Sequence, residues 1–507
     1  AQDERRESIV VTMLSRTAVV RAPINTDTSI VHSGLLAACG NGFSGITKLL
    51  LSAQADVNQE DDSSALSRAA FGGHVDCVEQ LIAAKANVDI VQMGVGASPV
   101  YVAAQNNHCR ALRLLIEADA DVNSARRDSD FSPIDVAAEN GHVGAIQLLL
   151  AVKVHPDRVR ARDGITPSYL AAQMGHADVL QALVNANASV NRSRTDRQTN
   201  LVYAAAQTGH SAALNVLVKA GADVNRGSVA APAYIAAQNG HEAAMQVLIS
   251  GRADLDIART DTGSTPLYVA AQNSHHRIVQ MLIAARAKVN KRKTVDGSSP
   301  VYIAAQKGCL KCLQLLVDAN ASLSQPRTDT DLTALDIATA GGNVQAVAIL
   351  IEGRADVNRR RRVDNVTATY LAVMHQHTPI VKLLAEAKAD LNVPIFSEGM
   401  SPIYLAAQKS DSKTLIVLAE AKADVNAQHH TTGSTVSHLL AQFGHSRLLE
   451  VLVKAKANVN TARPKDGVTP LWMAARHGHA NSVKLLLTAK ATVDQALVGS
   501  NQSPAFA

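Results

Sequence analysis

Histidine and cysteine are the residue types in this 507-residue chain that could bind a metal or carry redox chemistry. Ten of the 18 histidines occupy one position of a repeating pattern, directly after the turn between two predicted helices. These ten are His74, His108, His142, His176, His210, His241, His275, His377, His445 and His479. A structural zinc site needs four ligands, and no histidine pair of the chain has a second ligand set nearby. The sequence therefore predicts no metal site and no cofactor.

Cys309 and Cys312 form a Cys-x-x-Cys pair at the start of a predicted second helix. Zinc would require two more ligands, and a redox pair of this type is expected between strands and helices in a βαβ unit. We interpret both residues as buried or half-buried structural thiols. The chain has only five cysteines, and their scatter favours a reducing compartment, the cytoplasm or the nucleus.

Other catalytic patterns are missing from the sequence. No phosphate-binding glycine loop, zinc-protease helix or nucleophile elbow occurs. The aspartates recur at predicted turn tips, where Asp favours turns, and do not form isolated acid–base pairs. No apolar run approaches the roughly 20 residues of a membrane span. We therefore predict no enzyme and no membrane insertion in these residues.

The elements that position these residues follow from an internal repeat. An Asn, Asp or Ser closes each unit, and eleven of the thirteen intervals between these anchors are 34 residues, while two are 31. The anchors are Asn58, Asp89, Asn123, Asp157, Asn191, Asn225, Asp256, Asn290, Ser324, Asn358, Asn392, Asn426, Asn460 and Asp494. The two short intervals shorten the connections at 59–64 and 226–231.

Each unit contains two short helical patterns. Ser or Thr before Pro, as at Thr265-Pro266, is an N-cap followed by Pro at the first helical position. The first helix continues through Ala-Ala and ends near a Gly such as Gly240, which suits a left-handed C-cap. The second helix has apolar residues at spacings of three and four, as at 278, 279, 282 and 283. A polar turn then leads to the next unit.

The unit Thr265-Pro266-Leu267-Tyr268, with the exit Ala-Asp-Val-Asn at 120–123, 222–225, 355–358 and 423–426, resembles the ankyrin repeat. The resemblance covers residues 34–507. It implies an all-α repeat solenoid of stacked helix-turn-helix units with short β-hairpin fingers, curved into a superhelix with a concave binding face. We predict three segments: a degenerate half-repeat or cap at 1–33, fourteen repeats at 34–494, and the start of a further repeat at 495–507. The array is expected to be a monomer and a fragment of a longer protein.

The sequence departs from the family pattern where the family has His in Thr-Pro-Leu-His. All eight tyrosines of the chain take that place, and its one tryptophan takes the same register. We interpret these rings as structural, each packing against the adjacent unit, with a ladder that stacks ligand rings as the alternative. The residues are Tyr101, Tyr169, Tyr203, Tyr234, Tyr268, Tyr302, Tyr370, Tyr404 and Trp472.

Basic residues accumulate in the middle fingers, the segments between an anchor and the next helix. A stripe of this kind favours an acidic partner, although interleaved aspartates offset part of the charge. Nucleic acid is the alternative polyanion, and the scarcity of aromatic residues in the fingers disfavours it. The candidate partner-binding residues of the fingers are Arg192, Arg194, Arg197, Lys291, Arg292, Lys293, Arg359, Arg360, Arg361 and Arg362.

The first helix ends in two positions with different behaviour. The position after Ala-Ala is Gln in most units, and the next position varies from unit to unit. The ankyrin resemblance implies that this end of the helix lies on the binding side, so we place candidate partner contacts at the position that varies: Asn106, Met174, Thr208, Lys307 and Lys409. The sequence thus predicts a non-catalytic scaffold or adaptor for protein partners. The alternatives are a regulatory or targeting arm of an enzyme or membrane protein, and a binder of nucleic acid.

Overall fold

The computed structural model describes residues 28–493 apart from 60–62, 92–95 and 197, together with Val498. The predicted cap at 1–33 and the predicted further repeat at 495–507 therefore lie largely outside the described residues. Internal contacts divide the chain into two compact units, Ala1–Ile257 and Ala258–Ala507. The described residues form 28 helices and two isolated β-bridges, so the predicted all-α repeat solenoid is confirmed.

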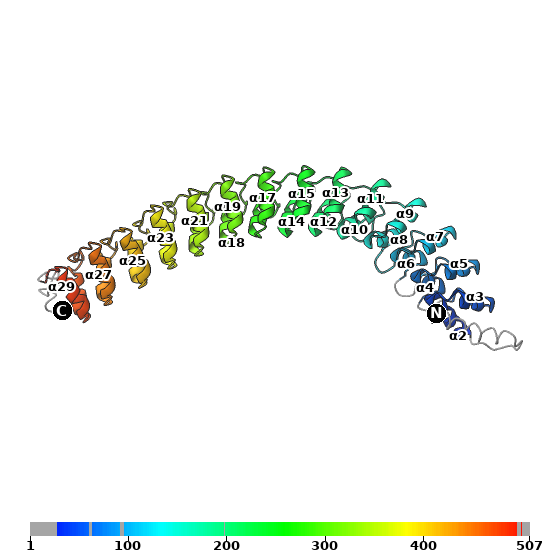
Figure 1. Cartoon of the computed structure of the whole chain (residues 1–507), viewed down its shortest axis with the longest axis horizontal. Helices are drawn as coiled ribbons and strands as arrows, with labels where there is room; N and C mark the ends of the chain where they lie inside the picture. Colours follow the sequence, from blue (N-terminus) through cyan, green and yellow to red (C-terminus); the bar gives the residue numbers. More distant parts are fainter. Residues whose placement is uncertain (1–27, 60–62, 92–95, 197, 494–497, 499–507) are drawn as a thin grey trace. The chain divides into compact units, whose positions relative to one another are not determined.

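The helices come in successive pairs, coloured in chain order in Figure 1. The first unit contains α2 (Thr28–Asn41), α3 (Ser44–Ser52), α4 (Ala65–Gly72), α5 (Val75–Ala83), α6 (Pro99–Gln105), α7 (Cys109–Glu117), α8 (Pro133–Glu139), α9 (Val143–Ala151), α10 (Pro167–Met174), α11 (Ala177–Asn185), α12 (Leu201–Thr208), α13 (Ser211–Lys219), α14 (Pro232–Asn239) and α15 (Glu242–Ser250). The first helix begins six residues before the predicted start of the array at 34.

The second unit repeats the same arrangement. It contains α16 (Pro266–Gln272), α17 (His276–Ala284), α18 (Pro300–Lys307), α19 (Leu310–Asp318), α20 (Ala334–Ala340), α21 (Val344–Glu352), α22 (Ala368–Met374), α23 (Thr378–Glu386), α24 (Pro402–Gln408), α25 (Ser412–Glu420), α26 (Val436–Gln442), α27 (Ser446–Lys454), α28 (Pro470–Arg476) and α29 (Ala480–Thr488). In both units, even-numbered helices pack on even-numbered ones and odd on odd, and each pair also packs within itself. The result is two layers of helices.

The core of each pair comes from a few recurring positions. The Ala-Ala of the first helix is fully buried, as at Ala270 and Ala271, and lets neighbouring backbones approach closely. The second helix contributes three side chains on one face, and Ile278, Val279 and Leu282 are 0% exposed. This spacing is the one the sequence predicts for an amphipathic helix.

The ends of the first helices are capped as the sequence predicts. Thr265 Oγ1 accepts a hydrogen bond from the Tyr268 amide at 3.1 Å, and Pro266 occupies the first helical position. At the other end, Gly175 has a φ of 86°, which an L side chain rarely adopts. The His210 ring of the next pair also lies where a Cβ on Gly175 would be, so glycine is required there for two reasons.

The anchor residues join consecutive pairs. The Asn392 amide donates to Asp390 Oδ1 at 3.0 Å within its own turn. Its side-chain Oδ1 accepts from the Asp424 amide, 32 residues further on, at 2.7 Å. The same bond links Asn358 to the Asp390 amide and recurs through both units. The Asp-x-Asn motif thus satisfies one amide in its own turn and one in the next pair.

The fingers are tight hairpin turns. Arg160 donates its amide to Ile165 O, and the Gly164 amide donates back to Arg160 O, both at 2.9 Å. A third bond runs from the Thr195 amide to Asp163 O of the preceding finger at 3.0 Å. The described residues contain bridges only at Ser193–Asn200 and Gln428–Thr435, so these fingers are too short for strand ladders.

We expect Leu282→Ala to destabilise the pair α16–α17 by about 2–5 kcal/mol, because it leaves a cavity among fully buried side chains. Loosening should extend to α19, which packs directly on α17. Amide hydrogen exchange over these three helices measures both effects. Gln280→Ala, an exposed change on the same helix, is the control and should alter exchange little. Unchanged protection in Leu282→Ala would contradict the burial assigned to this side chain.

Candidate partner-binding surface

We use the name aromatic register for the first-helix position that is Tyr in eight repeats and Trp472 in another. Its side chains face the interior. Seven of the eight tyrosines are buried, with exposed fractions from 1% at Tyr302 to 8% at Tyr404. Tyr203 is half-buried. Some hydroxyls reach the following finger: Tyr268 Oη lies 3.0 Å from Ser298 Oγ, 30 residues further along the chain. Trp472 is 7% exposed in the same register. This placement leaves no exposed aromatic ladder for ligand rings at these positions.

Several fingers carry a cation that lies over the ring of the preceding first helix. The Arg327 guanidinium lies 5.6 Å from the centre of the Tyr302 ring. The same guanidinium pairs with Asp329 at 2.6 Å. Arg126 and Arg194 make equivalent contacts with a tyrosine ring and a finger aspartate. These cations therefore close their own fingers and hold them against the helices.

The four-arginine finger divides into two inward and two outward side chains. Arg359 pairs with Asp331 at 2.5 Å, and Arg361 pairs with Asp364. The hydrogen bond from Arg361 lowers the pKa of the Asp364 carboxyl. Arg360 and Arg362 are exposed, and the Arg360 guanidinium lies 3.6 Å from Asp390 Oδ2. The predicted basic stripe is thus largely neutralised by aspartates two or three residues away or in the preceding finger.

The remaining finger residues of the prediction are also engaged. Lys293 Nζ lies 3.4 Å from Asp296 Oδ2, and Arg192 donates to Asp157 O at 3.1 Å. Arg292 donates to Pro326 O, and Lys291 is half-buried. Arg197 lies outside the described residues. Charge on these fingers holds the array together and leaves a small net surplus for a partner.

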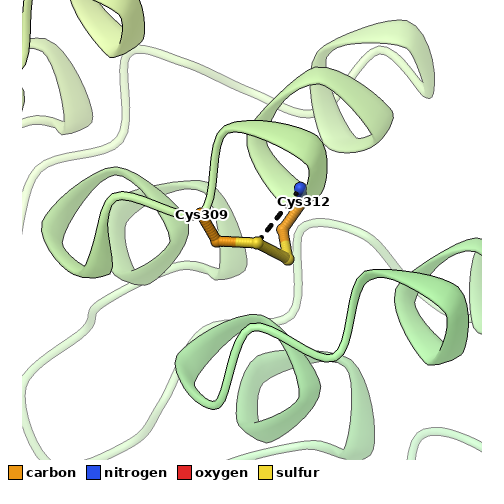
Figure 2. The surroundings of a disulfide bond; sticks show 2 residues. All are labelled: Cys309 and Cys312. Atoms are coloured by element: carbon orange, nitrogen blue, oxygen red, sulfur yellow. Dashed lines mark hydrogen bonds between the residues drawn. A yellow bond between two sulfur atoms is a disulfide. The ribbon is translucent and has the colours of Figure 1, made fainter.

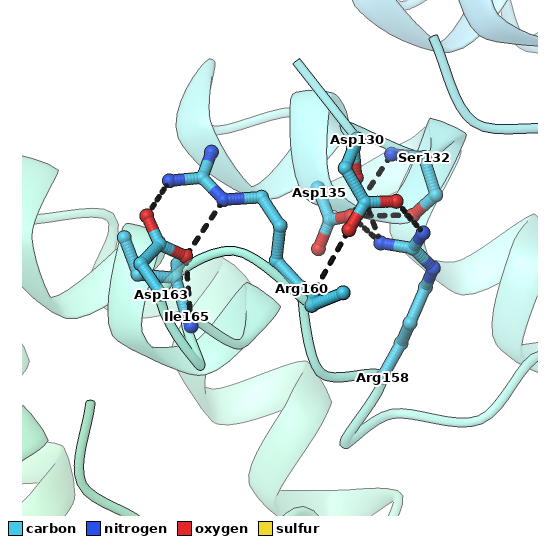
Figure 3. A network of polar contacts seen from close by, with 8 residues as sticks. Asp130, Ser132, Asp135, Arg158, Arg160, Asp163 and Ile165 are labelled. Atoms are coloured by element: carbon cyan, nitrogen blue, oxygen red, sulfur yellow. Dashed lines mark hydrogen bonds and ion pairs between the residues drawn. The ribbon is translucent and has the colours of Figure 1, made fainter. Parts of the chain in front are cut away.

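Two buried aspartates, which are not among the predicted site residues, replace tyrosine in the aromatic register. Asp135 Oδ2 accepts from the Ser132 amide at 2.9 Å and from Arg158 at 2.7 Å (Figure 3). Arg158 also pairs with Asp130 at 2.9 Å. Burial raises the pKa of the Asp135 carboxyl, while Ser132 and Arg158 oppose that rise. Asp336 forms the equivalent network in the second unit, with Asp331, Thr333 and Arg359.

The turn histidines bond to the backbone of the preceding pair. His142 Nε2 lies 2.9 Å from Gln105 O, and His479 Nε2 lies 2.9 Å from Gln442 O. These carbonyls end the first helices, where backbone acceptors lack a partner within the helix. The repeated histidine is therefore a structural link, and no three His, Cys, Asp or Glu side chains of the described residues are grouped to hold a metal ion.

Cys309 takes the place of that histidine in one pair, and the prediction of two thiols there is wrong for this structure. Cys309 and Cys312 form a disulfide (Figure 2). Their Cα atoms lie 5.3 Å apart, within the range that a disulfide spans, because an N-cap residue and the residue three positions later face each other. Cys312 is 0% exposed and its amide donates to Cys309 Sγ.

The variable position that follows the recurring Gln at the end of the first helix is exposed in most pairs. Met174 is 43% exposed, and Lys307 and Lys409 are also exposed. Asn106 Nδ2 and Thr208 Oγ1 instead bond back to carbonyls of their own helices at 2.9 and 3.0 Å. We use the name first-helix surface for the exposed ends of the even-numbered helices together with the adjoining fingers. Phe443, 53% exposed, belongs to it as well.

The chain matches a family model of three ankyrin repeats over residues 35–126, 134–228, 230–293, 287–361, 335–429 and 422–496. It therefore belongs to the ankyrin repeat family, and the resemblance in the sequence is confirmed. Among solved structures, the chain is similar to the ankyrin repeat domain of human ASB11. That match has 26% identity and a TM-score of 0.39, and it covers 44% of this chain and 98% of the other. No curated protein matches the chain.

Ankyrin repeats are generally protein-interaction scaffolds, and the fold is typically a non-catalytic binding module. Among the helices of the described residues, none combines the length and the apolar character needed to cross a membrane.

His438 provides a pH-dependent test of the register. It occupies the tyrosine place, with Nδ1 2.9 Å from Thr435 Oγ1 and Nε2 2.9 Å from Val468 O. Burial lowers the pKa of His438 from 6.5 to about 4. The unfolded chain therefore takes up a proton below pH 6.5 that the folded chain takes up only near pH 4, so stability falls as the pH falls through this window.

We expect this single group to cost about 2 kcal/mol of stability between pH 7 and pH 5, since one pKa unit corresponds to about 1.4 kcal/mol. His438→Tyr, which restores the commonest residue of the register, should remove that part of the acid sensitivity. Urea unfolding followed at both pH values measures it. The control is His477→Asn, a change at an exposed histidine that also lies in the compact unit Ala258–Ala507. Equal acid sensitivity in all three proteins would contradict the burial of a neutral His438.

Proposed function

We propose that the chain is a non-catalytic scaffold or adaptor that binds a protein partner along its first-helix surface. One observation carries this proposal. The repeating anchors, turn histidines and finger cations are used in bonds within and between pairs, whereas the exposed residue after the recurring Gln changes from pair to pair. A surface that varies residue by residue on a constant frame suits recognition of a specific protein.

The charges of the fingers refine the expected partner. Arg359 and Arg361 are committed to aspartates, whereas Arg362 is exposed and Arg360 is exposed with only a 3.6 Å pair to Asp390. Paired cations release few counterions from a polyanion, so nucleic acid is the weaker candidate. A protein with scattered acidic side chains fits the exposed cations better. The cytoplasm or nucleus remains the proposed location.

The test is affinity capture of partners by the whole chain, followed by comparison of two matched variants. Lys307→Ala, Lys409→Ala and Phe443→Ala together should weaken binding of a captured protein at least tenfold, because they remove exposed side chains of the first-helix surface. The control combines Lys219→Ala and Lys382→Ala, exposed positions on second helices. Titration of the purified partner against each variant gives the dissociation constants.

Two results would count against the proposal. Equal weakening by both variants would place the interface elsewhere. If none of the captured proteins binds the chain after purification, the scaffold function is contradicted.

A further inference from the structure

Ser67 is a small residue at the position of the aromatic register in α4. It stands in α4 at the position that Tyr101 holds in α6, 34 residues later. The local backbone is the same in both helices: the Ser67 amide donates to Ser64 Oγ at 3.1 Å, and the Tyr101 amide donates to Ser98 Oγ at 3.2 Å. Only the ring is missing.

Among the described residues, none replaces the missing ring with a polar bond of the kind seen at Asp135, and Ser67 itself is 4% exposed. Where Asp135 replaces tyrosine, Arg158, 23 residues further on, reaches in and bonds to it. The equivalent residue after Ser67 is Ile90, which has no polar group to offer. A groove of about 400 Å³ remains. Its lining includes Ser63, Ser67, Arg68, Phe71, Ala97 and Tyr101.

The lining has the features of an aromatic site. Ala97 stands 30 residues after Ser67, the spacing at which Tyr169 Oη meets Thr199 Oγ1 in a complete pair. The groove floor at this point is therefore small and apolar. Phe71 replaces the usual Gln at the groove edge and is 59% exposed. A ring that enters the groove can pack against both residues.

The charge of the lining is positive. Arg68 donates from Nε to Ser63 Oγ at 2.7 Å, and none of the described carboxylates forms an ion pair with it. Arg126, at the other end of the groove, is already committed to Asp128 and to the Tyr101 ring. Arg68 is thus the cation available to a ligand. Beside an exposed phenyl ring, it favours a ligand that carries a carboxylate next to an aromatic group.

We propose that this groove binds an acidic peptide segment of the protein partner through one Tyr or Phe side chain. The ring enters the space that the chain's own tyrosines fill in other pairs, and a flanking Asp or Glu pairs with Arg68. The proposal rests on the protein-binding function proposed above and specifies one contact of that surface.

The test uses a fluorescein-labelled peptide, Gly-Glu-Glu-Tyr-Glu-Glu-Gly, titrated with the whole chain and followed by fluorescence anisotropy. A second peptide with Ala in place of Tyr should bind at least tenfold more weakly. Ser67→Tyr should weaken binding of the first peptide by a similar factor, because the ring then comes from within. Its melting temperature should be kept or raised, since the register accepts tyrosine in eight other pairs.

A second variant, at Arg68, tests the groove independently of any structural change that Ser67→Tyr causes. Arg68→Glu should also weaken the Tyr peptide at least tenfold, while Lys219→Glu, an exposed charge reversal on α13, should leave binding unchanged. Equal binding of the two peptides, or wild-type binding by folded Ser67→Tyr, would overturn the groove as an aromatic site.

The same variant separates this proposal from the scaffold function. A partner captured equally by the wild type and by Ser67→Tyr, but lost from the Lys307, Lys409 and Phe443 variant, would overturn the groove and leave the scaffold standing. Loss of the partner from Ser67→Tyr, with its peptide affinity reduced in parallel, would support both.

Discussion

The bond from an anchor side chain to an amide of the next helix pair is the interaction on which the rest of the structure depends. A helix pair of this size cannot bury both of its apolar faces alone, so its stability comes from its neighbours. The bond from the Asp424 amide to Asn392 Oδ1 fixes how far one pair stands from the next. With that spacing fixed, a turn histidine reaches the preceding carbonyl and a tyrosine reaches the following finger. The repeat of the sequence is the repeat of these bonds.

Because the frame is so regular, each departure from it has an identifiable local consequence. Asp135 in place of tyrosine requires Arg158, since a buried carboxylate without a partner would be costly. His438 satisfies both ring nitrogens and remains neutral. Cys309 in place of histidine removes a link to the preceding pair and brings a disulfide instead. None of the described residues bonds to Ser67 as Arg158 bonds to Asp135, and Ser67 lines a groove. Departures that are compensated avoid the cost of an unpaired buried group, and an uncompensated one is where the proposed ligand would bind.

Much of the fold follows from the sequence because the deciding interactions are local or periodic. Caps such as Thr265 and the buried face of α17 depend on residues three or four positions apart, and the period carries them from pair to pair. The sequence overstates the basic charge that the fingers offer to a partner. A run such as 359–362 does not reveal that Arg359 and Arg361 pair with aspartates. The groove at Ser67 could have been noticed as a small residue in an aromatic register. Its volume and the exposure of Phe71 depend on packing between two pairs, which spacing alone does not give.

The groove also bears on how binding would act on the array. It is lined by residues of α2, α4 and α6 and of the adjoining fingers, so it exists only while these three helices remain packed together. A ligand that binds this packed state and not the frayed one must stabilise the junction between the pairs by mass action. In a stack where each pair contacts only its neighbours, that stabilisation acts first on the adjacent pairs and fades along the chain. The proposed partner ring would add packing at this junction, so recognition and local order would be coupled at this point.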